Sequence, residues 1–203
     1  MANACKSAVA TFLKDGLDID DAMDEQLRDG MLANCPDKPT VRLISQTESP
    51  TVNPVTGQPV VGSGDLQVIV GGPYGQNLIR YLESTGATRI SDTYDGNGAQ
   101  FHLRGADGGI GTVIVDAPMA TLNEHHDFFL VEMLRDPTTS TLVFAVYGFS
   151  SSGTISGTWY FTNVILTSLP TFDKSYYIYE WTDVDGDSKP GSADTFDLVT
   201  SGL

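Results

Sequence analysis

The sequence predicts an α/β or α+β fold in which helices cover a layered sheet. Two apolar runs, residues 65–70 and 142–148, have the character of buried strands, and each leads through glycine into a helical pattern. A chain of 203 residues is long enough to bury one good core. We expect four successive parts: a helical hairpin (1–36), a strand with an exposed loop (37–64), an α/β body (65–170) and a C-terminal β-hairpin (171–203).

The first part is expected to be an antiparallel pair of helices. Residues 4–15 and 20–31 place apolar side chains at helical spacing, Gly16 is a natural helix end, and Asp20 is expected to cap the second helix. The pair would bring Cys5 beside Cys35, so that the two can form a disulfide in an oxidising exterior. Two unpaired buried thiols, as in a reducing compartment, are the alternative.

The middle of the chain is expected to alternate strands with helices. Residues 40–45 predict a short strand, and the Pro and Gly turn signals in residues 46–64 predict a long exposed loop. Two strand–glycine–helix units later in the chain indicate some parallel pairing. In the body we predict strands at residues 65–70, 88–93, 99–103, 112–115 and 142–148, and helices at 78–84 and from 156 or 157 to about 166.

A glycine-rich loop joins the first strand of the body to its helix. A loop in this position can hold phosphate. This one lacks the lysine of a P-loop and the glycine spacing of a dinucleotide-binding fingerprint. We therefore interpret Gly71, Gly72 and Pro73 as a tight turn that allows close packing.

An acidic loop of twelve residues, 183–194, is the strongest candidate for a binding site. Carboxylates stand at its positions 1, 3, 5 and 12, as Asp183, Asp185, Asp187 and Asp194. These positions, with the backbone carbonyl at position 7 (here Lys189), hold Ca²⁺ in calcium loops of this length. We therefore expect these five residues to bind Ca²⁺.

The loop departs from the usual helix–loop–helix calcium motif. Gly186 occupies position 4, and Ser188 occupies position 6, where the usual loop needs glycine. The flanking residues 176–181 and 195–199 have β-forming composition, so we predict a strand–loop–strand hairpin. The alternative is a solvated acidic turn without a metal.

Composition excludes several classes of partner. A net charge of −15 argues against nucleic acid and against docking on anionic lipid. No apolar run reaches the length of a membrane span. No charged and apolar leader opens the sequence, so we expect any signal peptide to have been removed.

Three other groups of residues are weaker candidates. The motif Glu124-His125-His126-Asp127 could serve a hydrolase, but adjacent histidines point to different sides, which favours a solvated turn. The carboxylates Asp92, Asp95 and Asp107 are interpreted as turn caps rather than a second calcium site. The aromatic strand at residues 176–181 could present a sugar-binding face, but core packing is the preferred interpretation.

Several motifs, in order, resemble archaeal surface-layer (S-layer) proteins. Residues 68–77 are similar to that family's strand, Gly-Gly-Pro, small residue and Asn signature, and residues 145–158 to its later strand–glycine–helix start. The aromatic strand with Trp181, followed by an Asp-Gly-Asp turn and Pro190, is similar to the family's C-terminal part. The resemblance covers residues 65–203 and implies an extracellular structural protein, in which Asn77 supports the glycine loop by hydrogen bonding.

These observations together predict a non-enzymatic, calcium-stabilised protein of the cell surface. It would be an S-layer-like or filament subunit, with self-association or other cell-surface proteins as partners. The first alternative is a secreted glycan-binding or adhesion module, which would use the aromatic strand and the Pro-rich loop. The second is a hydrolase that would use the Glu124–Asp127 motif.

Overall fold

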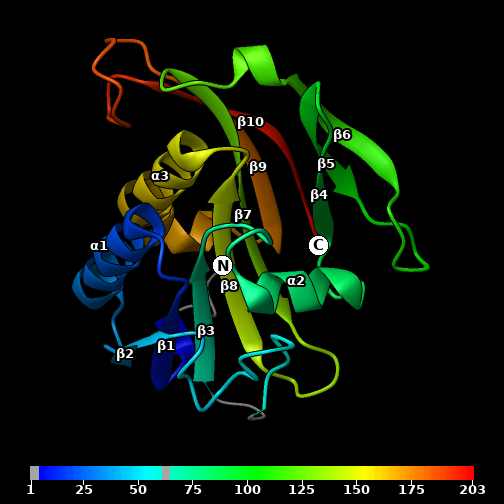
Figure 1. The fold of residues 1–203 in the computed structure, drawn as a ribbon. Coiled ribbons are helices and arrows are strands. Elements are labelled where there is room, and N and C mark those ends of the chain that lie inside the picture. The colour runs from blue at the N-terminus through cyan, green and yellow to red at the C-terminus, as the bar shows by residue number, and fades with distance from the viewer. Residues whose placement is uncertain (1–4, 61–64) are drawn as a thin grey trace.

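A computed structural model describes residues 5–60 and 65–203, which fold into two sheets and three α-helices (Figure 1). The large sheet has seven strands in the order β10-β9-β7-β8-β3-β1-β2, and the small sheet has the order β4-β5-β6. The large sheet comprises β1 (Val9–Lys14), β2 (Thr40–Ser45), β3 (Asp65–Val70), β7 (His126–Arg135), β8 (Leu142–Gly148), β9 (Tyr176–Thr182) and β10 (Thr195–Gly202). The small sheet comprises β4 (Ile90–Tyr94), β5 (Gly98–Leu103) and β6 (Thr112–Pro118), and the helices are α1 (Asp18–Asn34), α2 (Asn77–Ser84) and α3 (Ser151–Tyr160).

The large sheet is mixed. Strands β2, β1, β3 and β8 are parallel neighbours, whereas β7 is antiparallel to both β8 and β9, and β9 to β10. The predicted α/β character and partial parallel pairing are therefore confirmed. All four parts expected from the sequence contribute strands to this one sheet.

The predicted N-terminal helical hairpin is wrong, because its first half is the strand β1. Phe12 packs toward α1 and Leu13 toward α2, so the strand is buried on both faces. A short run of apolar residues fits a doubly buried strand as well as it fits a helix. Gly16 therefore ends no helix; it turns the chain from β1 into α1 with a left-handed φ of 89°.

The second predicted helix is confirmed as α1, but it begins earlier than expected. Asp20 lies inside the first turn and is not the cap. Leu17 occupies the N-cap position, and its N–H donates to Asp15 Oδ1 at 2.8 Å. Acidic residues at the start of α1 are favourably placed near the positive end of the helix dipole.

The predicted disulfide is present between Cys5 and Cys35, with Cα atoms 5.1 Å apart. Cys5 precedes β1 and Cys35 follows α1, and the two elements run in opposite directions. The strand thus brings Cys5 beside Cys35, as the expected helix would also have done. The crosslink staples the start of β1 to the end of α1.

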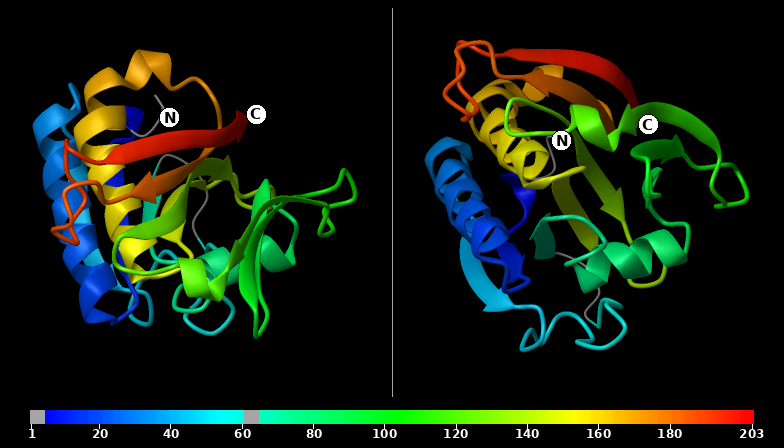
Figure 2. Two further views of the ribbon diagram at one scale, coloured as in Figure 1. Left: turned by 90° about the horizontal axis from the view of Figure 1, so that it is seen from above. Right: turned by 45° about the horizontal axis from the view of Figure 1, so that its top comes forward.

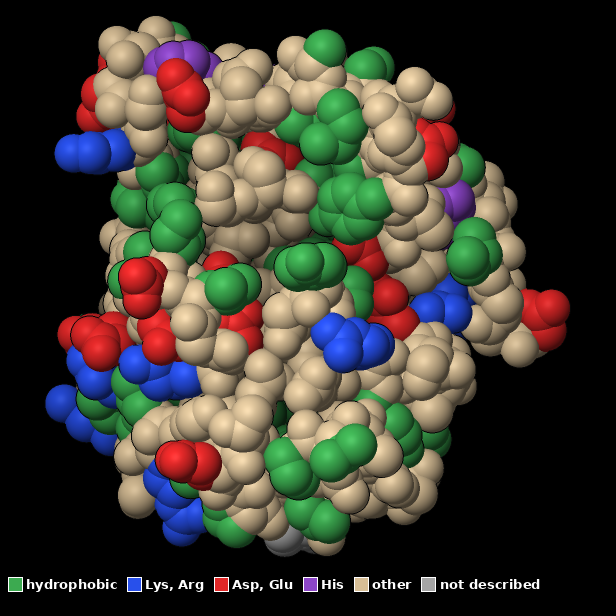
Figure 3. Space-filling model, viewed as in Figure 1, with side chains coloured by type: hydrophobic (Ala, Val, Ile, Leu, Met, Phe, Trp, Pro, Cys, Tyr) green, Lys and Arg blue, Asp and Glu red, His purple; other side chains and the backbone are tan. Residues whose placement is uncertain are grey.

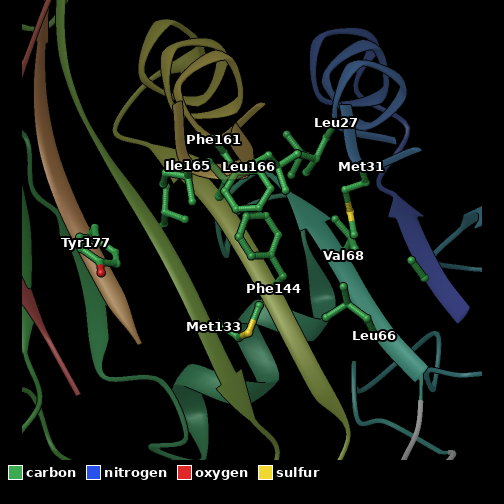
Figure 4. Close-up of a cluster of buried hydrophobic side chains, with 14 of the residues drawn as sticks. Leu27, Met31, Leu66, Val68, Met133, Phe144, Phe161, Ile165, Leu166 and Tyr177 are labelled. Carbon is green, nitrogen blue, oxygen red and sulfur yellow. The ribbon is translucent and has the colours of Figure 1, made fainter. Parts of the chain in front are cut away.

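Helices cover the two faces of the large sheet differently. Figure 2 shows α1 and α3 together on one face, with α2 and the small sheet on the other. On the first face, Leu27 and Met31 of α1 share one buried cluster with Phe161 and Ile165, which continue the chain beyond α3. In this cluster Phe161 packs on Phe144 of the sheet, with ring centres 4.2 Å apart (Figure 4). No helix among the described residues is long and apolar enough to cross a bilayer.

Candidate metal-binding loop

The acidic loop connects β9 to β10 at one end of the large sheet. The two strands are antiparallel, with Thr195 opposite Thr182, so the predicted strand–loop–strand arrangement is confirmed. β9 also pairs with β7, and β10 is the edge strand. The loop therefore projects from a hairpin that is anchored in the sheet on its β9 side only.

Three of the predicted ligands come together in this loop. Asp183, Asp185 and Asp187 each offer a carboxylate oxygen, and the three oxygens lie within 4.8 Å of one another. Asp183 is 9 % exposed, whereas Asp185 and Asp187 are exposed. Like charges at this separation repel, and a hard cation with oxygen ligands would relieve the repulsion.

Asp183 is the fixed member of this cluster. Its Oδ1 accepts the N–H of Gly186 at 2.7 Å, and its Oδ2 accepts the N–H of Ser188 at 2.8 Å. Nδ1 of His125 also lies 2.6 Å from Oδ2. The His125 hydrogen bond is the main reason that the pKa of Asp183 is lowered to about 2, and the same contact raises the pKa of His125. Asp183 is therefore ionised and held in place before any ligand arrives.

The backbone of the loop turns sharply at two positions. Gly186 and Ser188 have left-handed φ values of 78° and 62°. Asp185 accepts the N–H of Asp187 at 3.3 Å, and Asp187 accepts the N–H of Lys189 at 2.8 Å. These local bonds keep the exposed carboxylates on the turn, although serine rather than glycine occupies one strained position.

Asp194 is not a member of the carboxylate cluster. Its Oδ2 accepts the indole N–H of Trp181 at 3.2 Å and the N–H of Gly191 at 2.8 Å. Its Oδ1 accepts the N–H of Val184 at 3.0 Å. Asp194 therefore closes the base of the loop by hydrogen bonding.

The residues of the Glu124–Asp127 motif face different partners. His125 meets Asp183, with Glu124 3.8 Å from its other ring nitrogen. His126 contacts Glu180 at 2.8 Å through Nε2 and the carbonyl of Thr121 at 2.9 Å through Nδ1. The divergence expected of adjacent histidines is confirmed.

Asp127 serves the loop between β8 and α3. It is buried, and its Oδ2 accepts the N–H groups of Ser150 and Gly153 at 3.0 and 2.9 Å. Burial raises its pKa, and these hydrogen bonds oppose the increase. Asp127 thus fixes the start of α3, a role that the sequence motif does not indicate.

Of the three aspartates expected to cap turns, Asp95 and Asp107 do so, whereas the prediction for Asp92 is wrong because it lies within β4. Asp95 Oδ1 accepts the N–H groups of Asn97 and Gly98 at 2.7 and 2.8 Å in the hairpin between β4 and β5. Asp107 Oδ1 accepts the N–H of Gly109 at 3.0 Å. Asp92, by contrast, lines a crevice described below.

The glycine loop after β3 is a close-packed turn, as predicted. Gly71 has a φ of 101°, and a Cβ on it would lie 2.5 Å from Asp20 Oδ2. A Cβ on Gly72 would lie 3.2 Å from the ring of Tyr147. Asn77 donates to the carbonyl of Pro54 at 3.0 Å, so it ties the loop region to the preceding segment.

Gln76 is a structural residue of the loop that the sequence analysis missed. It is fully buried, and its Nε2 donates to the carbonyls of Leu13 and Val70, both at 2.9 Å. It therefore bridges the ends of β1 and β3. No local signal marks this role, because both partners come from the arrangement of the strands.

The aromatic strand β9 is part of the core. Tyr177, Tyr179 and Trp181 are 5, 4 and 1 % exposed, and Tyr179 stacks on Phe129 with ring centres 5.5 Å apart. The preferred interpretation of core packing is confirmed. This strand therefore presents no aromatic platform to a ligand.

A scan against protein-family models matches no family, and a search of curated proteins finds no match.

Proposed function

We propose that this protein is a calcium-stabilised, non-enzymatic structural protein of the cell surface, as an S-layer-like or filament subunit. The observation that carries the proposal is the convergence of Asp183, Asp185 and Asp187 at the tip of the β9–β10 hairpin. Ca²⁺ would take one oxygen from each and complete its shell with backbone carbonyls and water.

The ion would act on the edge of the sheet. β10 is held by β9 on one side, and Phe196 of β10 stacks on Trp159 of α3 with ring centres 5.3 Å apart and planes 8° apart. Neutralising the loop would remove repulsion at the point where the hairpin turns. Calcium would therefore stabilise the register and position of β10.

Three observations support an extracellular setting. A disulfide persists where the surroundings are oxidising, and Cys5 and Cys35 form one. An exposed site with few protein ligands suits the high calcium concentration found outside cells. The resemblance to S-layer proteins in residues 65–203 points to the same setting.

The two edge strands of the large sheet offer a route to assembly. β10 and β2 are its edge strands, and edge strands present backbone groups to which another chain can pair. Leu198 and Val199 of β10 are 53 and 38 % exposed, at a bulge in its pairing with β9. Pairing of β10 with β2 of the next copy would be heterologous, and such contacts generate open arrays.

Electron microscopy of the purified protein with calcium and then with chelator tests this function. We expect sheets or fibres with calcium that disperse when the ion is removed. Asp185→Ala should prevent assembly, whereas Asp197→Ala, which removes an exposed carboxylate of β10, should not. Particles that stay monomeric with calcium would contradict the assembly role.

A further inference from the structure

A crevice of about 390 Å³ opens at the carboxyl ends of the parallel strands, far along the chain from the acidic loop. The turns that follow β1, β3 and β8 contribute to it, through Leu17, Gly71 and Ser150. Tyr94 of the small sheet forms the opposite wall. Figure 3 shows hydrophobic side chains and carboxylates lying together around the centre of this face.

The topology explains why a crevice forms there. The connection that leaves β1 passes through α1 on one face of the sheet, whereas the connection that leaves β3 passes through α2 on the other. The two connections therefore diverge beyond the ends of these neighbouring parallel strands. In open α/β sheets, ligands bind in the crevice at such a switch point.

Carboxyl groups are built into the walls of this crevice. Asp20 is half-buried against Gly71. The neighbouring Asp15 packs its Oδ2 against Gly75, where a Cβ atom would lie only 2.3 Å from that oxygen. Asp92 lines the far side with its Oδ2 buried, and its carboxyl group interacts with that of the neighbouring Glu83 and with the hydroxyl group of Tyr94. Two glycines thus make room for carboxyl groups at one end of the crevice, and the buried carboxyl group of Asp92 lines the other end.

Two tyrosine rings stand at the crevice. Tyr74 is 94 % exposed, an unusual state for a tyrosine, and Tyr94 is 50 % exposed. The guanidinium of Arg80 donates to the carbonyls of Pro73 and Tyr74 at 3.0 and 2.7 Å, which holds the Tyr74 backbone in place. Tyr94 packs edge-on against Phe149, with ring centres 6.1 Å apart.

We propose that this crevice binds a neutral carbohydrate. The rings of Tyr74 and Tyr94 would pack against the C–H faces of a sugar. The carboxyl groups of Asp20 and Asp92 would bond to its hydroxyl groups. Apolar walls with a few placed polar groups are typical of small-molecule sites.

The charges around the crevice favour a neutral ligand over an ionic one. Among the described residues, no Lys or Arg lines the crevice itself. Arg80 lines the adjoining hollow, but its guanidinium is bonded to the carbonyls of Pro73 and Tyr74 and to Asn77 Oδ1, which disfavours phosphate or another anion as the ligand. Burial, with the charge of Asp15, raises the pKa of Asp20 to about 7, and burial raises the pKa of Asp92 to about 6. Near neutral pH these groups exchange between acid and carboxylate, so they can both donate to and accept from hydroxyl groups.

Saturation-transfer NMR with glucose, mannose, galactose and N-acetylglucosamine, each at millimolar concentration, tests the proposal. We expect transfer to the ring C–H protons of at least one sugar. Tyr74→Ala should weaken that binding roughly tenfold or more, because it removes a stacking surface. Asp20→Asn should also weaken it, whereas Ile110→Ala, an exposed apolar truncation outside the crevice, should not.

Three results would overturn the carbohydrate assignment. The first is the absence of transfer to every sugar, and the second is transfer that is unchanged in Tyr74→Ala. The third is binding of spermidine without binding of any sugar, which would identify a cation site. Because Tyr74 is almost fully exposed, its truncation should leave the fold intact, and the amide spectrum of the variant checks this.

Discussion

The indole N–H of Trp181 donates to Oδ2 of Asp194, 3.2 Å away, across the base of the acidic loop. Trp181 is buried in β9, and Asp194 is the last residue before β10. The bond therefore joins the core to the closing residue of the loop. It also separates two roles that the sequence pattern combines: Asp194 shapes the loop, while Asp183, Asp185 and Asp187 gather at its tip.

Asp194→Ala should lower the free energy of unfolding by about 1–3 kcal/mol, because three N–H donors lose their acceptor. We expect a similar loss with calcium and with chelator, measured by urea denaturation followed by tryptophan fluorescence. Asp197→Ala is the matched control on β10 and should change stability little. A loss seen only with calcium would assign Asp194 to the ion instead.

Ser188→Gly should stabilise the protein by roughly 0.5–1 kcal/mol, since Ser188 has a φ of 62° that glycine adopts without strain. Thermal unfolding measures the difference. Ser192→Gly is the control. Ser192 lies in the same loop but has no positive φ, so glycine there should be neutral or destabilising. If the two substitutions have equal effects, backbone strain at Ser188 is not the cause of the stabilisation.

Removing the disulfide should lower the free energy of unfolding by about 2–4 kcal/mol, because Cys5 and Cys35 close a long loop with a separation of 30 residues. The double variant Cys5→Ala/Cys35→Ala and the reduced wild type should show comparable losses in urea denaturation. If both unfold at the wild-type midpoint, the crosslink contributes nothing to stability.

Asp24 should make stability fall as pH rises. It is fully buried in α1, and neither carboxylate oxygen has a hydrogen-bond partner in the described chain. Burial raises its pKa to about 9, with a smaller contribution from Asp15, Asp20 and Asp21 that Lys14 partly offsets. The folded state therefore holds a proton that the unfolded chain releases near pH 4. The contribution of this bound proton to the free energy of unfolding is fully present below about pH 4 and is lost progressively up to about pH 9.

Asp24→Asn tests this directly, because it keeps the shape of the side chain without the charge. We expect it to raise the free energy of unfolding by about 1–3 kcal/mol at pH 8 and by much less at pH 5. Urea denaturation across this range measures the effect, with the exposed Glu25→Gln of the same helix as control. A variant that changes stability equally at both pH values would contradict a neutral Asp24.

Local patterns predicted the elements whose packing is simple. The β4–β5 hairpin, α2, β8 and the β9–β10 hairpin all follow from periodicity and turn residues. The strand β1 was misassigned, because burial on both faces removes the alternation that distinguishes a strand. The pattern does not indicate β7 either, because its apolar run is interrupted by the charged residue Glu132. In the structure Glu132 is buried and accepts the N–H of Arg89, which lies far away along the chain, at 2.6 Å.

The candidate sites show the same limit. The spacing of Asp183, Asp185 and Asp187 is local, and the structure brings them together. The contact of His125 with Asp183 spans 58 residues, and it depends on β7 pairing with β9. The crevice between Tyr74 and Tyr94 depends on which face each helix covers, so only the fold reveals it.

Calorimetric titration of the metal-free protein with calcium tests the central claim most directly. We predict binding of one ion to the wild type and to Asp197→Ala, and a loss of affinity of about tenfold or more in Asp185→Ala and Asp187→Ala. The bound wild type should also unfold at a higher temperature than the chelated protein. Absence of binding at millimolar calcium, or equal binding by all four proteins, would contradict a calcium-stabilised hairpin.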